Sequence, residues 1–241
     1  MEGPRVQLFV TCLVDSLTPE VGRASVDALE RSGCSVDMPS GQGCCGQPAF
    51  NVGMHEQARS MAAGTLDLLD ATDGPVVVPS GSCAAMIIRH YPDLFAGSKR
   101  EDQVRRVAAR VRELTQFLID DLGSPIRADC EGCTVAYQHS CHGLRELSIE
   151  DQPDALLEGV SRAPMAGERD CCGFGGLFSV EMPAVSTAIM ERKLDDLEAS
   201  GADTLVGGDV SCLLHLAGGL KRRGSDIAVR HISELLGHGD G

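Results

Sequence analysis

The stretch GCCGQ at residues 43–47 recurs in this chain as DCCGF at residues 170–174, 127 positions later. Two further cysteines accompany each copy, and these are Cys12 and Cys83 in the first copy and Cys141 and Cys212 in the second. The offset between the matching outer cysteines is 129 positions in both cases. Four cysteines that recur in one order, with offsets constant to two residues, indicate a duplicated module.

Strands and helices alternate in each copy. Hydrophobic periodicity predicts strands at 5–10, 76–78, 134–138 and 204–206, a short β-like run at 35–38, and helices at 19–31, 54–69, 102–121 and 183–199. Such alternation is typical of βαβ units with a parallel sheet. We therefore expect an α/β fold of two pseudo-repeated βαβ modules, residues 1–123 and 124–241, joined by a linker near residues 123–132.

Composition and charge exclude several classes of function. The chain has 241 residues, enough to bury a sizeable core, and 35 acidic against 21 basic side chains give a net charge of −14. It contains no Trp, six Phe and two Tyr. An acidic, aromatic-poor surface is unsuited to nucleic acids and to anionic membranes. The sequence has no apolar run long enough to span a bilayer and no signal-peptide pattern, so we expect a cytoplasmic protein without membrane insertion.

The eleven cysteines are the main chemical feature of the sequence. In a reducing compartment, clustered cysteines more often hold metals or carry redox chemistry than form disulfides. Loops at the carboxyl ends of parallel strands converge on one crevice, so each half can bring four thiolates to one centre. The candidate ligands are Cys12, Cys44, Cys45 and Cys83 in the first half and Cys141, Cys171, Cys172 and Cys212 in the second.

Four thiolates suit an iron–sulfur cluster or tetrahedral zinc. Structural zinc sites prefer C-x₂₋₄-C knuckles to adjacent cysteines, so the CC pairs favour iron and sulfide. Zinc, and thiol chemistry without metal, remain the alternatives. No G-x-G-x-x-G follows a strand, so the sequence gives no support to a Rossmann-bound dinucleotide.

The remaining cysteines and the nearby histidines have less specific interpretations. For Cys34 we expect a buried apolar role, with a fifth ligand of the first site as the alternative. Cys130 and Cys133 form a C-x-x-C in the predicted linker; we expect incidental thiols, with a redox pair or a ligand role as alternatives. We expect His142 to cap or support the second site and His215 to pack beside it.

In combination, the motifs around the cysteines resemble those of the cysteine-rich "CCG" domain family. They read FVTC at 9–12, GCCGQPA at 43–49, PSGSC at 79–83, HSCH at 139–142, CCGFGG at 171–176 and DVSC at 209–212. That family includes the B subunit of heterodisulfide reductase and the iron–sulfur subunit of glycolate oxidase. The small two-copy form looks most similar to the lactate utilisation A family, the iron–sulfur subunits of L-lactate dehydrogenase.

The resemblance implies an iron–sulfur electron-transfer subunit of a cytoplasmic system that oxidises L-lactate to pyruvate. It implies one cluster per half, of the [4Fe-4S] type, and two partners, a ferredoxin-like iron–sulfur subunit and a third small subunit. L-lactate itself is a candidate ligand. Two alternatives remain: a thiol/disulfide redox enzyme similar to heterodisulfide reductase, and a zinc or thiol binding module without turnover.

The chain departs from the heterodisulfide reductase pattern at two positions. That type ends each motif in Cys-x-x-Cys, whereas the first of these positions is Ser80 in one copy here and Asp209 in the other. Either side chain could supply an oxygen ligand. Oxygen is a hard partner for such iron, so we expect four thiolates in each half.

Overall fold

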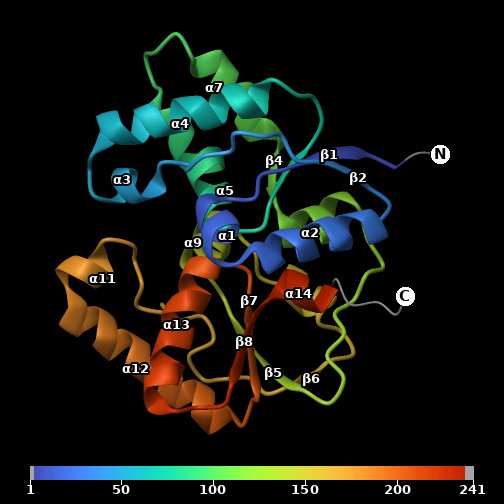
Figure 1. The fold of residues 1–241 in the computed structure, drawn as a ribbon, viewed down its shortest axis with the longest axis vertical. Helices are drawn as coiled ribbons and strands as arrows, with labels where there is room; N and C mark the ends of the chain where they lie inside the picture. The colour runs from blue at the N-terminus through green and yellow to red at the C-terminus, as the bar shows by residue number, and fades with distance from the viewer. Residues whose placement is uncertain (1–2, 237–241) are drawn as a thin grey trace.

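The computed structural model describes residues 3–236 and contains two four-stranded parallel sheets, one in each half of the chain (Figure 1). The first sheet has the order β2-β1-β3-β4 and consists of β1 (Arg5–Leu8), β2 (Ser35–Asp37), β3 (Val76–Val78) and β4 (Val111–Glu113). The second has the order β6-β5-β7-β8 and consists of β5 (Thr134–Gln138), β6 (Ser161–Arg162), β7 (Thr204–Gly207) and β8 (Ala228–His231). The identical strand order confirms the duplicated α/β fold.

Helices connect the strands in both halves. Those of the first half are α1 (Cys12–Leu17), α2 (Pro19–Arg31), α3 (Gln47–Asn51), α4 (His55–Asp70), α5 (Gly81–Ala85), η1 (Met86–His90), α6 (Tyr91–Leu94), α7 (Glu101–Arg110), α8 (Leu114–Gln116) and η2 (Phe117–Asp121). Those of the second half are α9 (Cys141–Glu146), α10 (Gln152–Leu156), α11 (Phe178–Glu181), α12 (Pro183–Ser200), α13 (Val210–Arg223) and α14 (Ile232–Leu236). No helix within residues 3–236 is long and apolar enough to cross a membrane.

The prediction of one continuous helix over residues 102–121 is wrong. The helix ends at Arg110, and Val111 takes an extended conformation so that β4 can pair with β3. Helical structure resumes at Leu114, where the Glu113 carboxylate accepts hydrogen bonds from the next turn. Apolar residues recur at helical spacing on both sides of this short strand, so periodicity alone does not reveal the break. Strands β6 and β8, which no pattern in the sequence predicted, are similarly short.

The two halves are packed together through a shared hydrophobic core. This core contains buried side chains from both sheets, among them Leu8, Val77, Val135 and Val206. Helix α14 of the second half packs against α2 of the first, and α8 of the first packs against α10 of the second. The last helical segment of each half, α8 with η2 in the first and α14 in the second, therefore packs against the other half. The predicted module limits, 1–123 and 124–241, stay a prediction, and their outer ends at 1–2 and 237–241 lie outside the described residues.

Candidate functional site

Four of the predicted cysteines lie at or near the start of helices that follow the central strands. Cys12 is the first residue of α1, after β1, and Cys141 is the first residue of α9, after β5. Cys83 lies in α5, after β3, and Cys212 lies in α13, after β7. In the middle of the molecule (Figure 1), α5 of the first half packs against α9 of the second, and α1 of the first packs against α13 of the second. The carboxyl ends of the parallel strands therefore point the outer cysteines of both halves toward one region.

The adjacent cysteine pairs reach the same region from two loops. We call residues 40–46 the first CCG loop and residues 167–173 the second. All eight predicted cysteines line one mainly apolar cavity of about 570 Å³, namely Cys12, Cys44, Cys45, Cys83, Cys141, Cys171, Cys172 and Cys212. The sequence predicted two convergent sets of four thiols. The structure brings both sets to a single cavity between the halves.

Each set of four thiols forms a chain of sulfur contacts. In the first half, Cys44 interacts with Cys12 and with Cys45, and the Cys45 thiol donates to the Cys83 sulfur at 3.4 Å. In the second half, Cys171 interacts with Cys141 and Cys172, and Cys172 interacts with Cys212. Among residues 3–236, no group of three or more His, Cys, Asp or Glu side chains is arranged to hold a single metal ion.

In each set of four thiols, one cysteine is stabilised most strongly as a thiolate, Cys44 in the first set and Cys171 in the second. Hydrogen bonds from Cys12 and Cys45 lower the pKa of Cys44, and the backbone N–H of Gly46 adds to this at 3.5 Å from the sulfur. Cys141 and Cys172 lower the pKa of Cys171 in the same way, with the Gly173 N–H at 3.3 Å. Backbone N–H groups aimed at sulfur favour the thiolate form that binds metal.

The glycine of each CCG motif is required by the backbone. Gly46 has φ +86°, and a Cβ there would lie 2.8 Å from the Ala58 carbonyl oxygen of α4. Gly173 has φ +92°, and its Cβ would lie 2.5 Å from the Ser186 carbonyl oxygen of α12. Only glycine combines this left-handed conformation with so close an approach to a helix. The glycine thereby holds the adjacent cysteine pair at the cavity.

Ser80 and Asp209 stand where the heterodisulfide reductase type has a cysteine, and their side chains contact each other across the two halves. One oxygen of the buried Asp209 carboxylate accepts from Ser80 Oγ at 3.2 Å and from the Ser82 N–H at 2.8 Å. The other oxygen accepts from the Ser211 N–H at 3.1 Å and so caps α13. The carboxylate therefore ties the loop of Cys83 to the helix of Cys212, and both of its oxygens are engaged in hydrogen bonds.

Gln47 joins the two halves at the cavity, and the sequence patterns did not single it out. Its Nε2 donates to the Ser82 carbonyl at 3.0 Å and lies 3.3 Å from Nε2 of His142, which also lines the cavity. The supporting role of His142 stays a prediction, whereas His215 packs against Phe174 with ring centroids 5.8 Å apart. The sequence feature that could have indicated the place of Gln47 at the cavity is its position directly after the CCG motif.

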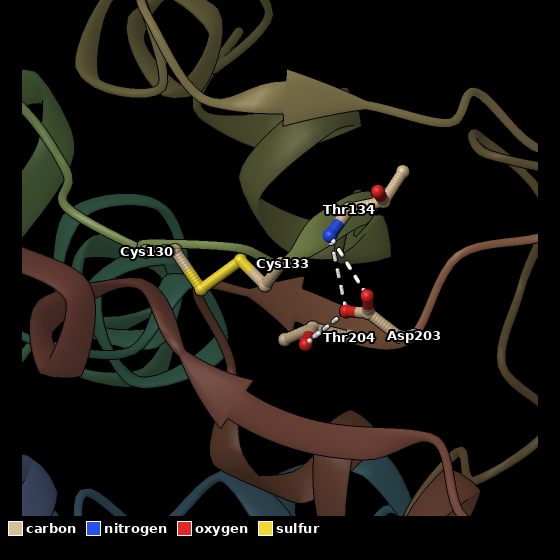
Figure 2. Close-up of a disulfide and its surroundings, with 5 residues drawn as sticks. All are labelled: Cys130, Cys133, Thr134, Asp203 and Thr204. Carbon is tan, nitrogen blue, oxygen red and sulfur yellow. Dashed lines mark hydrogen bonds between the residues drawn. A yellow bond between two sulfur atoms is a disulfide. The ribbon is translucent and has the colours of Figure 1, made fainter.

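The other three cysteines lie away from the cavity. Cys34 is buried in the core that the two halves share, which agrees with its predicted apolar role. Cys130 and Cys133 form a disulfide in the linker just before β5 (Figure 2), so the expectation of incidental thiols is wrong. Next to it, the Thr134 N–H donates to both carboxylate oxygens of Asp203, at 3.0 and 3.1 Å. These bonds fix the start of β5, which leads to Cys141 at its other end.

Comparisons with known proteins agree with this duplicated arrangement. The pattern of the cysteine-rich domain family named CCG matches residues 6–88 and again residues 135–217. Each match contains one full set of four cysteines. The fold and the site thus define a protein of two CCG domains.

Relatives over the whole length of the chain define the family more closely. The chain is 45% identical to lactate utilization protein A of Shouchella clausii over 96% of its own length and 98% of the relative's. It is 43% identical to lactate utilization protein A of an Exiguobacterium strain (98% and 98%) and 44% identical to that of Geobacillus kaustophilus (96% and 98%). The chain therefore belongs to the CCG domain family and, within it, to the family of lactate utilization A proteins.

The donor set fits an iron–sulfur cluster in each half. Each set consists of four thiols in a mainly apolar cavity, with a backbone N–H directed at one of the sulfurs. Thiolate ligands, low polarity and N–H···S hydrogen bonds are the features by which proteins hold such clusters and set their potentials. The residues that would hold them are those eight cysteines, and the clusters would supply one-electron transfer.

Proposed function

We propose that this chain is an iron–sulfur electron-transfer subunit of a cytoplasmic system that oxidises L-lactate to pyruvate. The observation that carries the proposal is the convergence of two four-thiol sets on one cavity in a chain whose relatives are named for lactate utilization. Each half would hold one [4Fe-4S] cluster. The shared cavity of about 570 Å³ supports electron transfer between the two sets.

The partners we propose are a ferredoxin-like iron–sulfur subunit and a third small subunit. Oxidation of a 2-hydroxy acid to a 2-oxo acid releases two electrons and two protons. An iron–sulfur cluster carries one electron at a time, so two centres in one chain suit a two-electron donor. The net charge of −14 favours encounter with partners that have basic docking faces.

Metal and sulfide analysis tests this proposal. The protein would be purified without oxygen and analysed for iron, acid-labile sulfide and zinc, with an EPR spectrum of the same sample. We expect iron and sulfide in equal amounts, several of each per chain, and a cluster signal after reduction. Stoichiometric zinc without sulfide would support a binding module instead, and turnover of disulfide substrates by the isolated chain would support the thiol/disulfide enzyme.

A further inference from the structure

Lys193 of α12 lies behind the second CCG loop, at the position that Thr65 of α4 occupies behind the first. The correspondence follows from the glycine contacts. Gly46 approaches the carbonyl of Ala58, and Gly173 approaches that of Ser186. Thr65 lies seven residues after Ala58, and Lys193 lies seven residues after Ser186. The two side chains therefore extend from equivalent turns of equivalent helices.

Lys193 places a buried positive charge beside the second set of cysteines. Only 2% of the residue is exposed, and its ammonium donates to the carbonyl oxygens of Gly167, of Glu168 at 3.3 Å and of Asp170 at 2.9 Å. An ammonium group has three donors and no acceptor, so three carbonyl partners match its charged form. All three carbonyls belong to the second CCG loop.

The charges around Lys193 come from the loop, from its own helix and from the thiols. Burial lowers its pKa, while Asp170, Cys172, Cys212 and Asp196 act in the opposite direction. Asp170 is exposed and Asp196 is half-exposed, so water screens both carboxylates. The buried ammonium therefore retains most of its effect on the cysteine set.

The first half has neutral groups at the back of its loop. The Thr65 hydroxyl donates to the Cys44 carbonyl at 3.2 Å, and the buried Tyr91 hydroxyl donates to the Cys45 carbonyl at 2.9 Å. A second difference has the same sign. Arg145 lies in α9 one helical turn after Cys141, whereas the residue 129 positions before it is the neutral Ser16. Lys193 and Arg145 both make the surroundings of the second cysteine set more positive. The buried Asp209 carboxylate is shared between the two sets, because it bonds Ser82 of the first half and Ser211 of the second.

We infer that the two sites are electrically inequivalent and that Lys193 gives the second site the higher reduction potential. A fixed cation in a poorly polarisable interior stabilises an added electron on a nearby cluster. The inference rests on the proposed iron–sulfur function. The first set of cysteines would then hold the cluster that gives up an electron, and the second set would hold the cluster that accepts it. A one-electron iron–sulfur partner would take it from the second set, and two such passages would remove the two electrons of one 2-hydroxy acid.

A redox titration followed by EPR tests the inference. The natural protein should show two separate one-electron steps. In Lys193→Gln, which keeps an amide donor but loses the charge, only the higher step should move to a more negative potential. We expect at least a tenfold change in its equilibrium constant, which is about 59 mV for a one-electron couple. Lys193→Arg should retain the natural potential, and Lys99→Gln, at an exposed lysine, is the matched control.

The outcomes separate the inference from the proposed function. The inference alone would be overturned by two equal reduction potentials in the natural protein. It would also be overturned if Lys193→Gln had a normal iron content and the same two reduction potentials as the natural protein. Absence of iron and sulfide from the natural protein would overturn the proposed function as well. If Lys193→Gln does not fold, Cys45→Ser serves instead, because it keeps Lys193 and its remaining step must be the higher of the two.

Discussion

The first and second cysteine sites share their thiols, their left-handed glycine and their chain of sulfur contacts, but they differ in what surrounds these parts. Thr65 lies behind one loop and Lys193 behind the other. Thr11 precedes Cys12 with φ 70°, whereas Ser140 precedes Cys141 with φ −76° and caps α9. The thiol donors and the conformation of the CCG glycine are the same in both halves. The groups that set charge and stability around them are not, so the two sites can have different potentials in one fold.

The interface between the halves shows a further difference, at the ends of two edge strands. Glu113 ends β4 and His231 ends β8, and both are almost fully buried. Glu113 accepts from the Thr115 N–H at 2.7 Å, and Nδ1 of His231 accepts from the Ser233 N–H at 3.2 Å. An acid and a base thus perform the same capping role in the two halves.

The largest predicted effect is on the pH dependence of the free energy of unfolding, to which Glu113 and His231 contribute with opposite signs. Burial raises the pKa of Glu113 from 4.5 to about 7, so its contribution to stability is lost as the pH rises through that range. Burial lowers the pKa of His231 from 6.5 to about 4, so its contribution is lost as the pH falls through that range. Relative to the natural protein, Glu113→Gln should gain about 3 kcal/mol as the pH rises from 4.5 to 7.

His231→Gln should show the reverse trend. Relative to the natural protein it should lose about 3 kcal/mol as the pH rises from 4 to 6.5. Urea unfolding at a series of pH values measures both slopes. Slopes of the same sign in the two variants would contradict the opposite pKa shifts of these two buried groups.

A smaller effect is predicted where α5 and α9 cross. A Cβ on Gly81 would lie 2.8 Å from Ser140 Oγ and 3.1 Å from the Gly143 nitrogen. The residues at the equivalent crossing, 129 positions away, are Val210 and Val14, which pack side by side. Gly81→Ala should therefore cost about 2 kcal/mol by overpacking.

Gly218→Ala is the control for this crossing. Gly218 is inside α13 with nothing near its Cβ position, so alanine should stabilise the helix by about 0.5–1 kcal/mol. Denaturant midpoints of the two variants should move in opposite directions. A Gly81→Ala variant that is as stable as the natural protein, or more stable, would show that the α5–α9 crossing has room for a methyl group.

The smallest predicted effects are at the residues before Cys12 and Cys141. The Ser140 hydroxyl accepts from the Gly143 N–H at 3.1 Å, so Ser140→Ala should cost about 1 kcal/mol through loss of the cap. Thr11 has φ 70° and ψ 150°, a conformation that suits glycine, so Thr11→Gly should stabilise the protein by up to about 1 kcal/mol. Thermal unfolding would compare the stability of the two variants. Destabilisation by Thr11→Gly would show that the backbone of Thr11 is not strained.

The sequence revealed the parts of the fold that depend on local pattern. The cysteine offsets predicted the duplication, and alternating strands and helices predicted the parallel sheets that bring the eight cysteines together. The break at Val111 was missed because its side chain continues the apolar helical spacing of the residues around it. For Cys130 and Cys133 a redox pair was only the alternative to incidental thiols, because a reducing compartment makes disulfides improbable.

The contacts between the halves could not be predicted from the sequence. The Ser80–Asp209 bond and the approach of Gln47 to His142 join residues 129 and 95 positions apart. These contacts depend on how the two modules pack against each other, which neither periodicity nor spacing determines. The buried charge of Lys193 was also hidden, because a lysine in an amphipathic helix is usually exposed.

The central claim of two separate iron–sulfur centres is tested most directly by removing one cysteine from each half. Cys45→Ser and Cys172→Ser would each be purified without oxygen and analysed for iron and acid-labile sulfide per folded chain. Because the two thiol sets are complete in themselves, each variant should retain about half of the natural iron and sulfide, and the double variant should retain none. Loss of all iron from either single variant, or full retention in both, would contradict the account.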